Sequence, residues 1–149
     1  MSAPLVRPVR RSDRAQWDVL WRGYNDFYER RIPKAVSDAT WRRFFDTREP
    51  VHALVATSGG RLVGVVHYIY HRSTSLDTRT CYLQDLFTAK DARGRGVGRA
   101  LIEAVYARAR RAGARRVYWH THRANKRAML LYDKVATSTG FVVYAKDIH

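Results

Sequence analysis

The chain has 149 residues, 46% of them hydrophobic, which suffices for one folded domain with a core and is too short for two. It has no run of about 18 apolar residues, so we expect no membrane-spanning segment. The basic N-terminus lacks an apolar stretch, which excludes a secretory signal. The single cysteine, Cys81, excludes an internal disulfide framework and fits a reducing compartment. We predict one cytoplasmic domain over residues 1–149.

The chain is strongly basic, with 28 Lys and Arg against 13 Asp and Glu and a formal net charge of +15. A basic surface attracts polyanions, which include nucleic acids and anionic cofactors. The arginines are scattered through every segment and form five adjacent pairs but no longer run. This scatter favours a compositional origin, although a basic nucleic-acid-binding module stays an alternative.

The first half of the chain predicts a strand, two helices and a hairpin. Apolar residues recur every three or four positions after Arg14, which is typical of an amphipathic helix that Ser12 or Asp13 can cap. Pro33 ends this helix, and Ser37 or Asp38 is expected to cap the next one. The expected strands are 6–10, 51–57, 62–70 and 80–88, with a turn at 58–60 between the second and third.

The second half alternates helices and strands. A glycine-rich loop leads into a helix that Gly113 ends, a strand follows at 116–121, and Asn125 opens another helix. Gly140 stops that region before a last strand at 141–145. The order is β-α-α-β-β-β-α-β-α-β, which predicts an α/β fold with a mixed sheet and helices on both faces.

The glycine loop, residues 91–99, has the composition of a phosphate-binding turn. Glycines at alternate positions let a ligand approach the backbone, and the following helix adds unpaired N–H groups and the positive end of its dipole. The loop lacks the Lys-Ser or Lys-Thr pair of a P-loop. It also lacks the third glycine and the later acid of a dinucleotide fingerprint. We therefore predict a diphosphate site of a different kind.

The pattern [Q/R]-x-x-G-x-[G/A], filled by Arg93, Gly96 and Gly98, resembles the pyrophosphate motif of the GNAT superfamily of acyl-CoA N-acyltransferases. A second family motif follows, with Asn125, then Tyr132 within Leu-Tyr-Asp-Lys, then Gly140-Phe141. The resemblance covers nearly the whole chain. It implies the GNAT fold, with a splay between the fourth and fifth strands. It also implies an acetyl-CoA-dependent N-acetyltransferase in which the amine attacks directly in a ternary complex.

The segments 82–88 and 117–121 resemble a narrower branch, which contains yeast histone- and D-amino-acid-acetylating enzymes and diamine acetyltransferases. Diamine acetyltransferases have Glu-Asp where this chain has Gln84-Asp85, and that glutamate receives the amine proton through water. Glutamine cannot take a proton near neutral pH, so a polyamine acceptor is less favoured. A catalytically impaired CoA-binding regulatory protein is the alternative that Gln84 supports.

The resemblance also assigns roles to residues. Tyr132 is expected to protonate the leaving thiolate, unless it is only a packed aromatic residue. Asn125 is expected to bond the pantetheine arm or to act as a plain helix N-cap. The arginines of the loop add charge or form a solvated basic face. The residues expected to bind the cofactor are Leu86, Phe87, Thr88, Arg93, Gly94, Arg95, Gly96, Val97, Gly98, Arg99, Asn125 and Ala128.

The acceptor is less defined by the sequence. Gln84 and Asp85 alternate in direction, and Gln84 is expected to face the acceptor while Asp85 is buried beside an arginine. Asp26 and Glu29 either bind a cationic amine or pair with Arg30 and Arg31 on the surface. The sequence leaves three alternatives for the general base that accepts the amine proton: a chain of water molecules, His120, or no residue of the protein. The expected acceptor is a small amine, an amino acid, a polyamine or a protein lysine. No metal site is expected. The resemblance to the narrower branch implies a homodimer.

Overall fold

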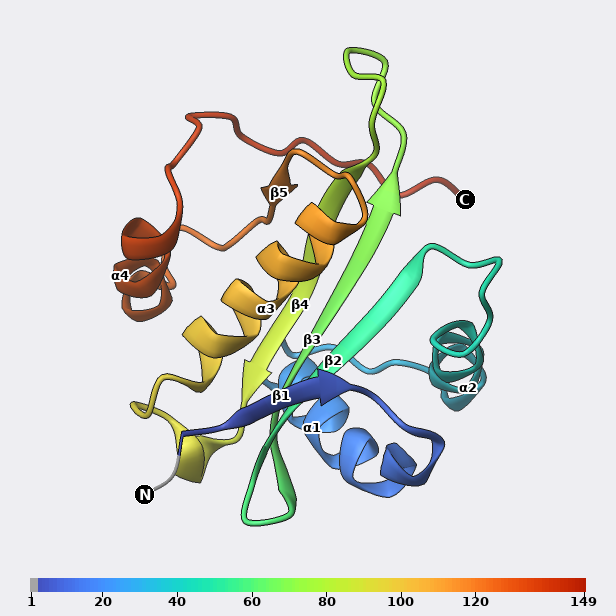
Figure 1. The fold of residues 1–149 in the computed structure, drawn as a ribbon, viewed down its shortest axis with the longest axis vertical. Helices are drawn as coiled ribbons and strands as arrows, with labels where there is room; N and C mark the ends of the chain where they lie inside the picture. The colour runs from blue at the N-terminus through green and yellow to red at the C-terminus, as the bar shows by residue number, and fades with distance from the viewer. Residues whose placement is uncertain (1–2) are drawn as a thin grey trace.

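The computed structural model describes residues 3–149, in which five strands form one sheet in the order β1-β2-β3-β4-β5 (Figure 1). Neighbouring strands from β1 to β4 are antiparallel, and β5 is parallel to β4. The strands are β1 (Leu5–Pro8), β2 (Val51–Ser58), β3 (Arg61–His71), β4 (Thr80–Thr88) and β5 (Val117–Tyr118). The helices are α1 (Arg14–Phe27), α2 (Lys34–Arg43), α3 (Val97–Arg111) and α4 (Lys126–Val135).

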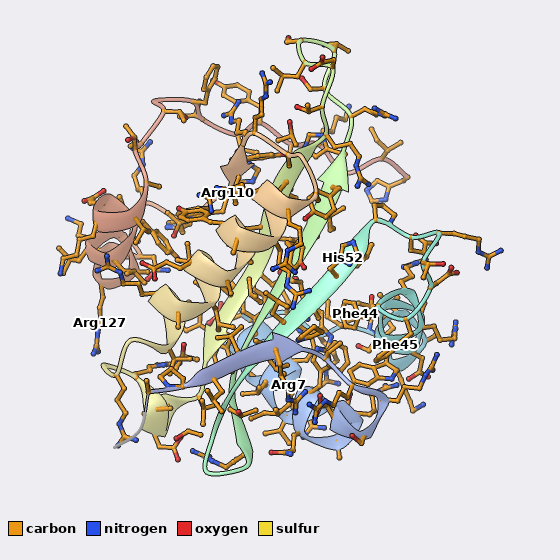
Figure 2. All side chains as sticks on the ribbon, in the orientation of Figure 1. Arg7, Phe44, Phe45, His52, Arg110 and Arg127 are labelled. Atoms are coloured by element: carbon orange, nitrogen blue, oxygen red, sulfur yellow. The ribbon has the colours of Figure 1, made fainter. Side chains whose placement is uncertain are left out.

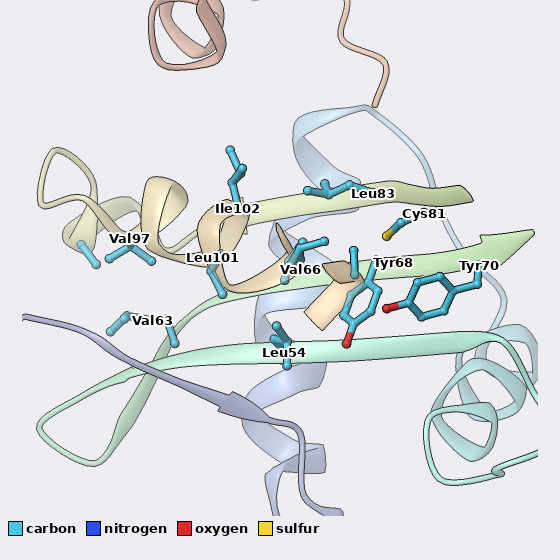
Figure 3. Packing of buried hydrophobic residues seen from close by; sticks show 14 residues of the cluster. Leu54, Val63, Val66, Tyr68, Tyr70, Cys81, Leu83, Val97, Leu101 and Ile102 are labelled. Carbon is cyan, nitrogen blue, oxygen red and sulfur yellow. The ribbon is translucent and has the colours of Figure 1, made fainter. Parts of the chain in front are cut away.

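Helices cover both faces of the sheet, which confirms the predicted mixed α/β architecture. On one face, Leu101 and other residues of α3 pack against residues of β2, β3 and β4, among them Leu54, Val66 and Leu83 (Figure 3). Residues of α4 join the edge of this cluster. On the other face, α1 and α2 meet the sheet through a second cluster of apolar residues around Trp17 and Trp41.

A glycine in β3 sets the position of α3. An added Cβ at Gly64 would lie 2.7 Å from Val97 Cγ1 and 3.0 Å from Leu101 Cδ1. Real side chains do not approach this closely, so a glycine is needed where the first turn of α3 crosses β3. The start of α3, and the glycine loop before it, are thereby held beside the end of β4.

The splay between β4 and β5 is present. The two strands pair only at Cys81–Val117 and Tyr82–Tyr118, while β4 continues for six further residues to Thr88. The separation begins beside a β-bulge, because Leu83 pairs with Tyr68 and Asp85 with His67, which leaves Gln84 without a partner on β3. A bulge adds local twist, which turns the rest of β4 away from a neighbouring strand.

The predicted helix caps are wrong. The Asp13 carboxylate does not cap α1; it pairs with Arg7 at 2.7 Å and accepts the N–H of Arg10 at 2.7 Å. The second helix starts at Lys34, directly after Pro33, so Ser37 and Asp38 lie within it. Their oxygens accept bonds from other elements, Ser37 from Trp21 and Asp38 from Arg14. For Ser37 and Asp38, side chains of α1 have replaced the local backbone groups that a cap would bind.

The predicted last strand, 141–145, is also absent from the structure, in which residues 137–149 form neither helix nor strand. The strand predicted at 116–121 is shortened to Val117–Tyr118. A strand needs a neighbour with which to share a hydrogen-bonded ladder, and no other strand among residues 3–149 lies on the outer edge of β5.

Cys81 lies in the core between β3 and β5, with no exposed surface. Burial raises the pKa of its thiol to about 12. The side chain therefore serves packing. None of the helices described in residues 3–149 is long and apolar enough to cross a membrane.

Candidate active site

The glycine loop presents open backbone to solvent. Gly94 and Gly96 have φ angles of +78° and +80°, which favour glycine, and an added Cβ at either would meet nothing within 4 Å. The first hydrogen bond of α3 runs from Ala100 N–H to Gly96 C=O at 3.0 Å. The three preceding N–H groups, including those of Val97 and Gly98, therefore have no carbonyl within the helix to bind. This is the geometry that anions select at a helix N-terminus.

Two arginines flank this loop, and the guanidinium group of each already contacts other groups of the protein. Arg93 Nε donates to the Thr88 carbonyl at 3.2 Å, and its guanidinium lies over the Phe87 ring, 5.5 Å from the centroid. Arg99 Nε pairs with Glu103 Oε1 at 3.0 Å. Their positive charge still surrounds the loop, but these contacts make the backbone N–H groups the better candidates for direct phosphate binding.

The loop adjoins the free edge of β4 and the start of α4. An added Cβ at Gly98 would contact Leu131 Cδ2 at 3.4 Å and lie 4.0 Å from Thr88 Oγ1, so β4, α3 and α4 converge here. Asn125 does not cap α4 with its side chain; its Nδ2 donates to Thr121 Oγ1 at 3.5 Å. Ala128 follows on the same helix, half-buried. Asn125 occupies the N-cap position of α4, where its side chain makes no capping hydrogen bond.

Tyr132 projects from α4 toward the region where β4 and β5 separate. Its ring packs edge-on against Trp119, with centroids 5.4 Å apart. Burial, and then the nearby Tyr28 phenol at the end of α1, raise the pKa of Tyr132 above its ordinary 10. The phenol therefore keeps its proton through neutral and moderately alkaline pH, which suits a proton donor.

A buried hydrogen-bonded chain lies on the α1 side of β4. Trp17 Nε1–H donates to His67 Nε2 at 3.0 Å, so Nε2 is the acceptor and the ring proton lies on Nδ1. His67 Nδ1 lies 2.9 Å from Asp85 Oδ2 and donates to it. The expected arginine partner of Asp85 is therefore wrong, since a histidine takes that place. This arrangement fixes the orientation of a buried carboxylate next to the splay.

Tyr24 and Arg30 extend this chain toward solvent. Burial, and then the Asp85 charge, raise the pKa of Tyr24. The Arg30 guanidinium lies over the Tyr24 and Tyr28 rings, 5.4 and 5.3 Å from their centroids, and its charge opposes the rise. A carboxylate, a phenol and a guanidinium thus gather where α1 ends.

The exposed acids nearby do not form the expected surface pairs. Within residues 3–149, neither Asp26 nor Glu29 makes an ion pair, and Arg30 stacks on tyrosines. Glu29 has a φ of +54°, where its N–H binds Asp26 C=O and the next N–H binds Asn25 C=O. Glycine is usual at such a helix end, so Glu29 carries backbone strain of about 1 kcal/mol.

Sequence reasoning missed much of this side of the site. Gln84 is exposed at the bulge, and His120 Nδ1 lies 3.3 Å from the Tyr82 hydroxyl. The sequence alone gives no site role to Trp17, Arg30 or His67. No local signal marks them, because the contacts join positions 18 and 50 residues apart.

The open glycine backbone, the unpaired helix N–H groups and the free edge of β4 fit a ligand with a diphosphate at one end and an extended amide-bearing arm. Coenzyme A has this form. The fold and the site therefore define an acyl-CoA-dependent acyltransferase.

The sequence matches the Acetyltransferase (GNAT) family over residues 17–136, and the chain belongs to this family. It is 37% identical over 145 residues to the D-amino-acid N-acetyltransferase HPA3 of Saccharomyces cerevisiae, covering 96% of this chain and 90% of that protein. It is 28% identical over 146 residues to the uncharacterized N-acetyltransferase YhfO of Bacillus subtilis, covering 96% and 97% of the two chains.

Solved structures share the fold. A ribosomal-protein-alanine N-acetyltransferase from Brucella melitensis superposes with a TM-score of 0.82 at 19% identity, covering 99% of this chain and 100% of that one. AAC(6')-Iy, in complex with the bisubstrate analogue CoA-S-monomethyl-acetylneamine, gives 0.85 at 17% identity with the same coverage. The protein is a GNAT N-acetyltransferase that uses acetyl-CoA.

The glycine loop yields the first prediction. Acetyl-CoA should raise the melting temperature, since a ligand that binds only the folded state stabilises it by about 2.7 kcal/mol at 100 times its Kd. Gly96→Asp should abolish this shift, because it adds a side chain and a negative charge to the open loop. The measurement is thermal unfolding with and without acetyl-CoA.

Gly113→Asp is the matched control. Gly113 lies just beyond the other end of α3, with a φ of +81° and open space around it, so the backbone strain is alike. Its shift should equal that of the wild-type protein. A Gly96→Asp protein that retains the full shift would remove the loop from cofactor binding.

Proposed function

We propose that the protein acetylates the primary amine of a small acceptor, with amino acids the favoured class, by direct attack of the amine in a ternary complex. The observation that carries this proposal is the gathering of Asp85, Tyr24 and Arg30 beside the splay. An amino acid has one cationic and one anionic group, which these residues complement. The similarity to a D-amino-acid N-acetyltransferase supports the same class.

Acetyl-CoA is proposed to bind along the open backbone of the glycine loop and of β4. The N–H groups of residues 94–99 would hold the diphosphate, with charge added by Arg93, Arg95 and Arg99. The backbone of residues 86–88 would bind the pantetheine arm along the unpaired edge of β4, as an added strand would bind. Asn125 and Ala128 would close the opposite side. Bound acetyl-CoA supplies an acetyl thioester, and the amine supplies the electron pair that attacks it.

Asp85 is the proposed acceptor of the amine proton, directly or through Tyr24 or a water. His67 is a positioning residue, because its Nδ1–H holds one carboxylate oxygen at 2.9 Å and leaves the other oxygen for the proton. Gln84 cannot perform this task, but its exposed amide at the bulge remains a candidate for orienting the acceptor. Asp85, the next residue along β4, is thus proposed to take the role of the glutamate that diamine acetyltransferases have at the position of Gln84.

Tyr132 is the proposed proton donor on the opposite side of the reaction. Its phenol gives one proton to the leaving sulfur, which balances the proton that Asp85 takes from nitrogen. The raised pKa keeps that proton in place until it is needed. Tyr132 belongs to α4 and Asp85 to β4, the strand that separates from β5 at the splay.

Substrate recognition is assigned to the end of α1. Arg30 is the proposed anchor for an acceptor carboxylate, and the unpaired acids Asp26 and Glu29 are proposed to attract the ammonium group. The strained backbone at Glu29 agrees with a functional role, since strain is often retained at binding sites. We place this activity in the cytoplasm and propose that the enzyme is a homodimer.

Asp85→Asn should lower turnover by about 10²-fold or more, because the amide cannot take a proton. Its size and its bond from His67 are preserved, so the acetyl-CoA melting shift should persist. The residual rate should climb with pH as the free amine loses its proton in solution. Asp26→Asn, an exposed acid on α1, should change KM more than turnover. Unchanged turnover in Asp85→Asn, with chemistry limiting, would exclude Asp85 as the base.

Tyr132→Phe should lower turnover by roughly 10–10³-fold while acetyl-CoA affinity stays near the wild-type value. The ring and its packing on Trp119 are kept. A donor must be protonated, and the pKa of Tyr132 is raised, so the loss of activity due to its ionisation should occur at a higher pH than for an ordinary tyrosine. Steady-state rates from pH 7 to 11 test both points. Equal pre-steady-state rates for the two proteins would remove Tyr132 from the reaction.

Arg30→Gln should raise KM about tenfold for amino acids and leave KM unchanged for the amines that lack the carboxylate, such as phenethylamine beside phenylalanine. Free-thiol release with D- and L-enantiomers measures this. Arg31→Gln, the neighbouring arginine, is the control and should affect neither substrate. Equal losses on phenylalanine and phenethylamine would show that Arg30 does not read the carboxylate.

A further inference from the structure

An aromatic surface lies at the end of the sheet where β4 begins. Tyr82 of β4 and Tyr118 of β5 are paired across the two strands, and their rings stack with centroids 5.0 Å apart and planes at 21°. The His120 ring lies 5.2 Å from that of Tyr82, and Ile69 of β3 is the partner of Tyr82 on its other side. These four residues are called the aromatic surface below; His120 is exposed, and the other three are half-buried.

The tyrosines of this surface point away from α3. Val117, Trp119 and Cys81 all belong to the apolar cluster that α3 covers. Because side chains alternate along a strand, Tyr82 and Tyr118 lie on the opposite face of the sheet. On that face α1 and α2 pack on a cluster that includes residues of β2 and β3, and both helices lie away from β5 (Figure 1). Within residues 3–149, the aromatic surface is part of neither cluster.

Hydrogen bonds hold the rings of this surface in place. The Tyr118 hydroxyl lies 2.7 Å from His71 Nε2, and His71 Nδ1 lies 2.8 Å from the Arg72 carbonyl. A carbonyl can only accept, so the neutral imidazole carries its proton on Nδ1 and the Tyr118 hydroxyl donates to Nε2. The Tyr82 hydroxyl lies 3.3 Å from His120 Nδ1. Rings that are already fixed lose little conformational entropy when a ligand packs against them.

The aromatic surface adjoins the proposed base. Burial, and then the Asp85 charge, raise the pKa of Tyr82, so this phenol lies within the field of that carboxylate. The proposed pantetheine arm runs in the other direction along β4, over residues 86–88. An acceptor whose amine approaches Asp85 therefore has its other atoms on the side of Tyr82 or at the end of α1. Its carboxylate is assigned to Arg30 at the end of α1, which leaves the aromatic surface for its side chain.

We propose that the aromatic surface is the subsite for the side chain of the acceptor, and that it selects amino acids whose side chain is aromatic. Aromatic rings pack favourably against one another in edge-to-face and offset arrangements. A benzyl side chain also removes more apolar area from water than the methyl group of alanine does. This inference rests on the proposed function, from which the position of the amine is taken. It does not require the carboxylate, so amines that lack one can also report on the subsite.

The test uses two pairs of acceptors, phenylalanine with alanine and phenethylamine with ethylamine. Only a phenyl ring differs within each pair, so the ratio of the two kcat/KM values, measured by free-thiol release, reports on the ring. The wild type should favour the ring by about tenfold or more. Tyr82→Ala should lower both ratios by about tenfold, and this comparison cancels the intrinsic difference in basicity between the amines. The acetyl-CoA melting shift should persist, which verifies that the variant is folded.

His52→Ala is the matched control. His52 is a half-buried ring near the start of β2, and it stacks on Tyr68 on the face that α3 covers, so both ratios should keep their wild-type values (Figure 2). His120→Ala removes an exposed ring of the aromatic surface and should lower both ratios even where Tyr82→Ala is unstable. Ratios that are equal in the wild type and in both surface variants would overturn the proposal, as would a wild type that favours the ring in neither pair. Turnover of the amines alone, with the ring still favoured, would contradict the amino-acid acceptor and support the subsite.

Discussion

One extra residue in β4 governs the arrangement of the site. Gln84 has no partner on β3, and the pairing of β4 with β5 stops just before it. Had the ladder continued regularly, the edge of β4 would be closed by β5. The bulge also changes the side-chain phase, so that Leu83 and Leu86 both join the core under α3 while Asp85 faces α1. The open edge and the oriented carboxylate have the same origin.

The elements that the sequence predicted well are those set by local patterns. The glycine loop, the helix after it and the strands on either side of residues 58–60 follow from residue spacing and turn composition. The caps failed because Asp13 binds Arg7 and the N–H of Arg10, while Ser37 and Asp38 bind side chains of α1. The hydrogen-bonded chain from Trp17 through His67 to Asp85 could not be predicted either, because its bonds join residues of three different elements. A histidine within an apolar strand looks like a packing residue until its neighbours on other elements are known.

The arginine-rich composition has a structural use that lysine would serve less well. Planar guanidinium groups lie over aromatic rings on both faces of the molecule and at the ends of the sheet. The arginines in these contacts are Arg11, Arg14, Arg30, Arg79, Arg93 and Arg116. Each shields part of an aromatic surface from water while keeping its charge accessible. These six arginines are thus distributed with the aromatic residues and are not gathered into one face.

The position of the single cysteine bears on how many covalent steps the enzyme can use. A thioester donor reacts readily with thiolates, and many acyl-transferring proteins pass the acyl group through a cysteine before it reaches the acceptor. Cys81 is fully buried in the sheet and its thiol pKa is raised to about 12, so it presents almost no thiolate at neutral pH. Cys81 therefore cannot form an S-acetylated intermediate, which excludes a ping-pong mechanism that passes the acetyl group through a cysteine. Because Cys81 is buried, a thiol reagent added to the folded enzyme reacts with the thiol of the released coenzyme and not with the protein.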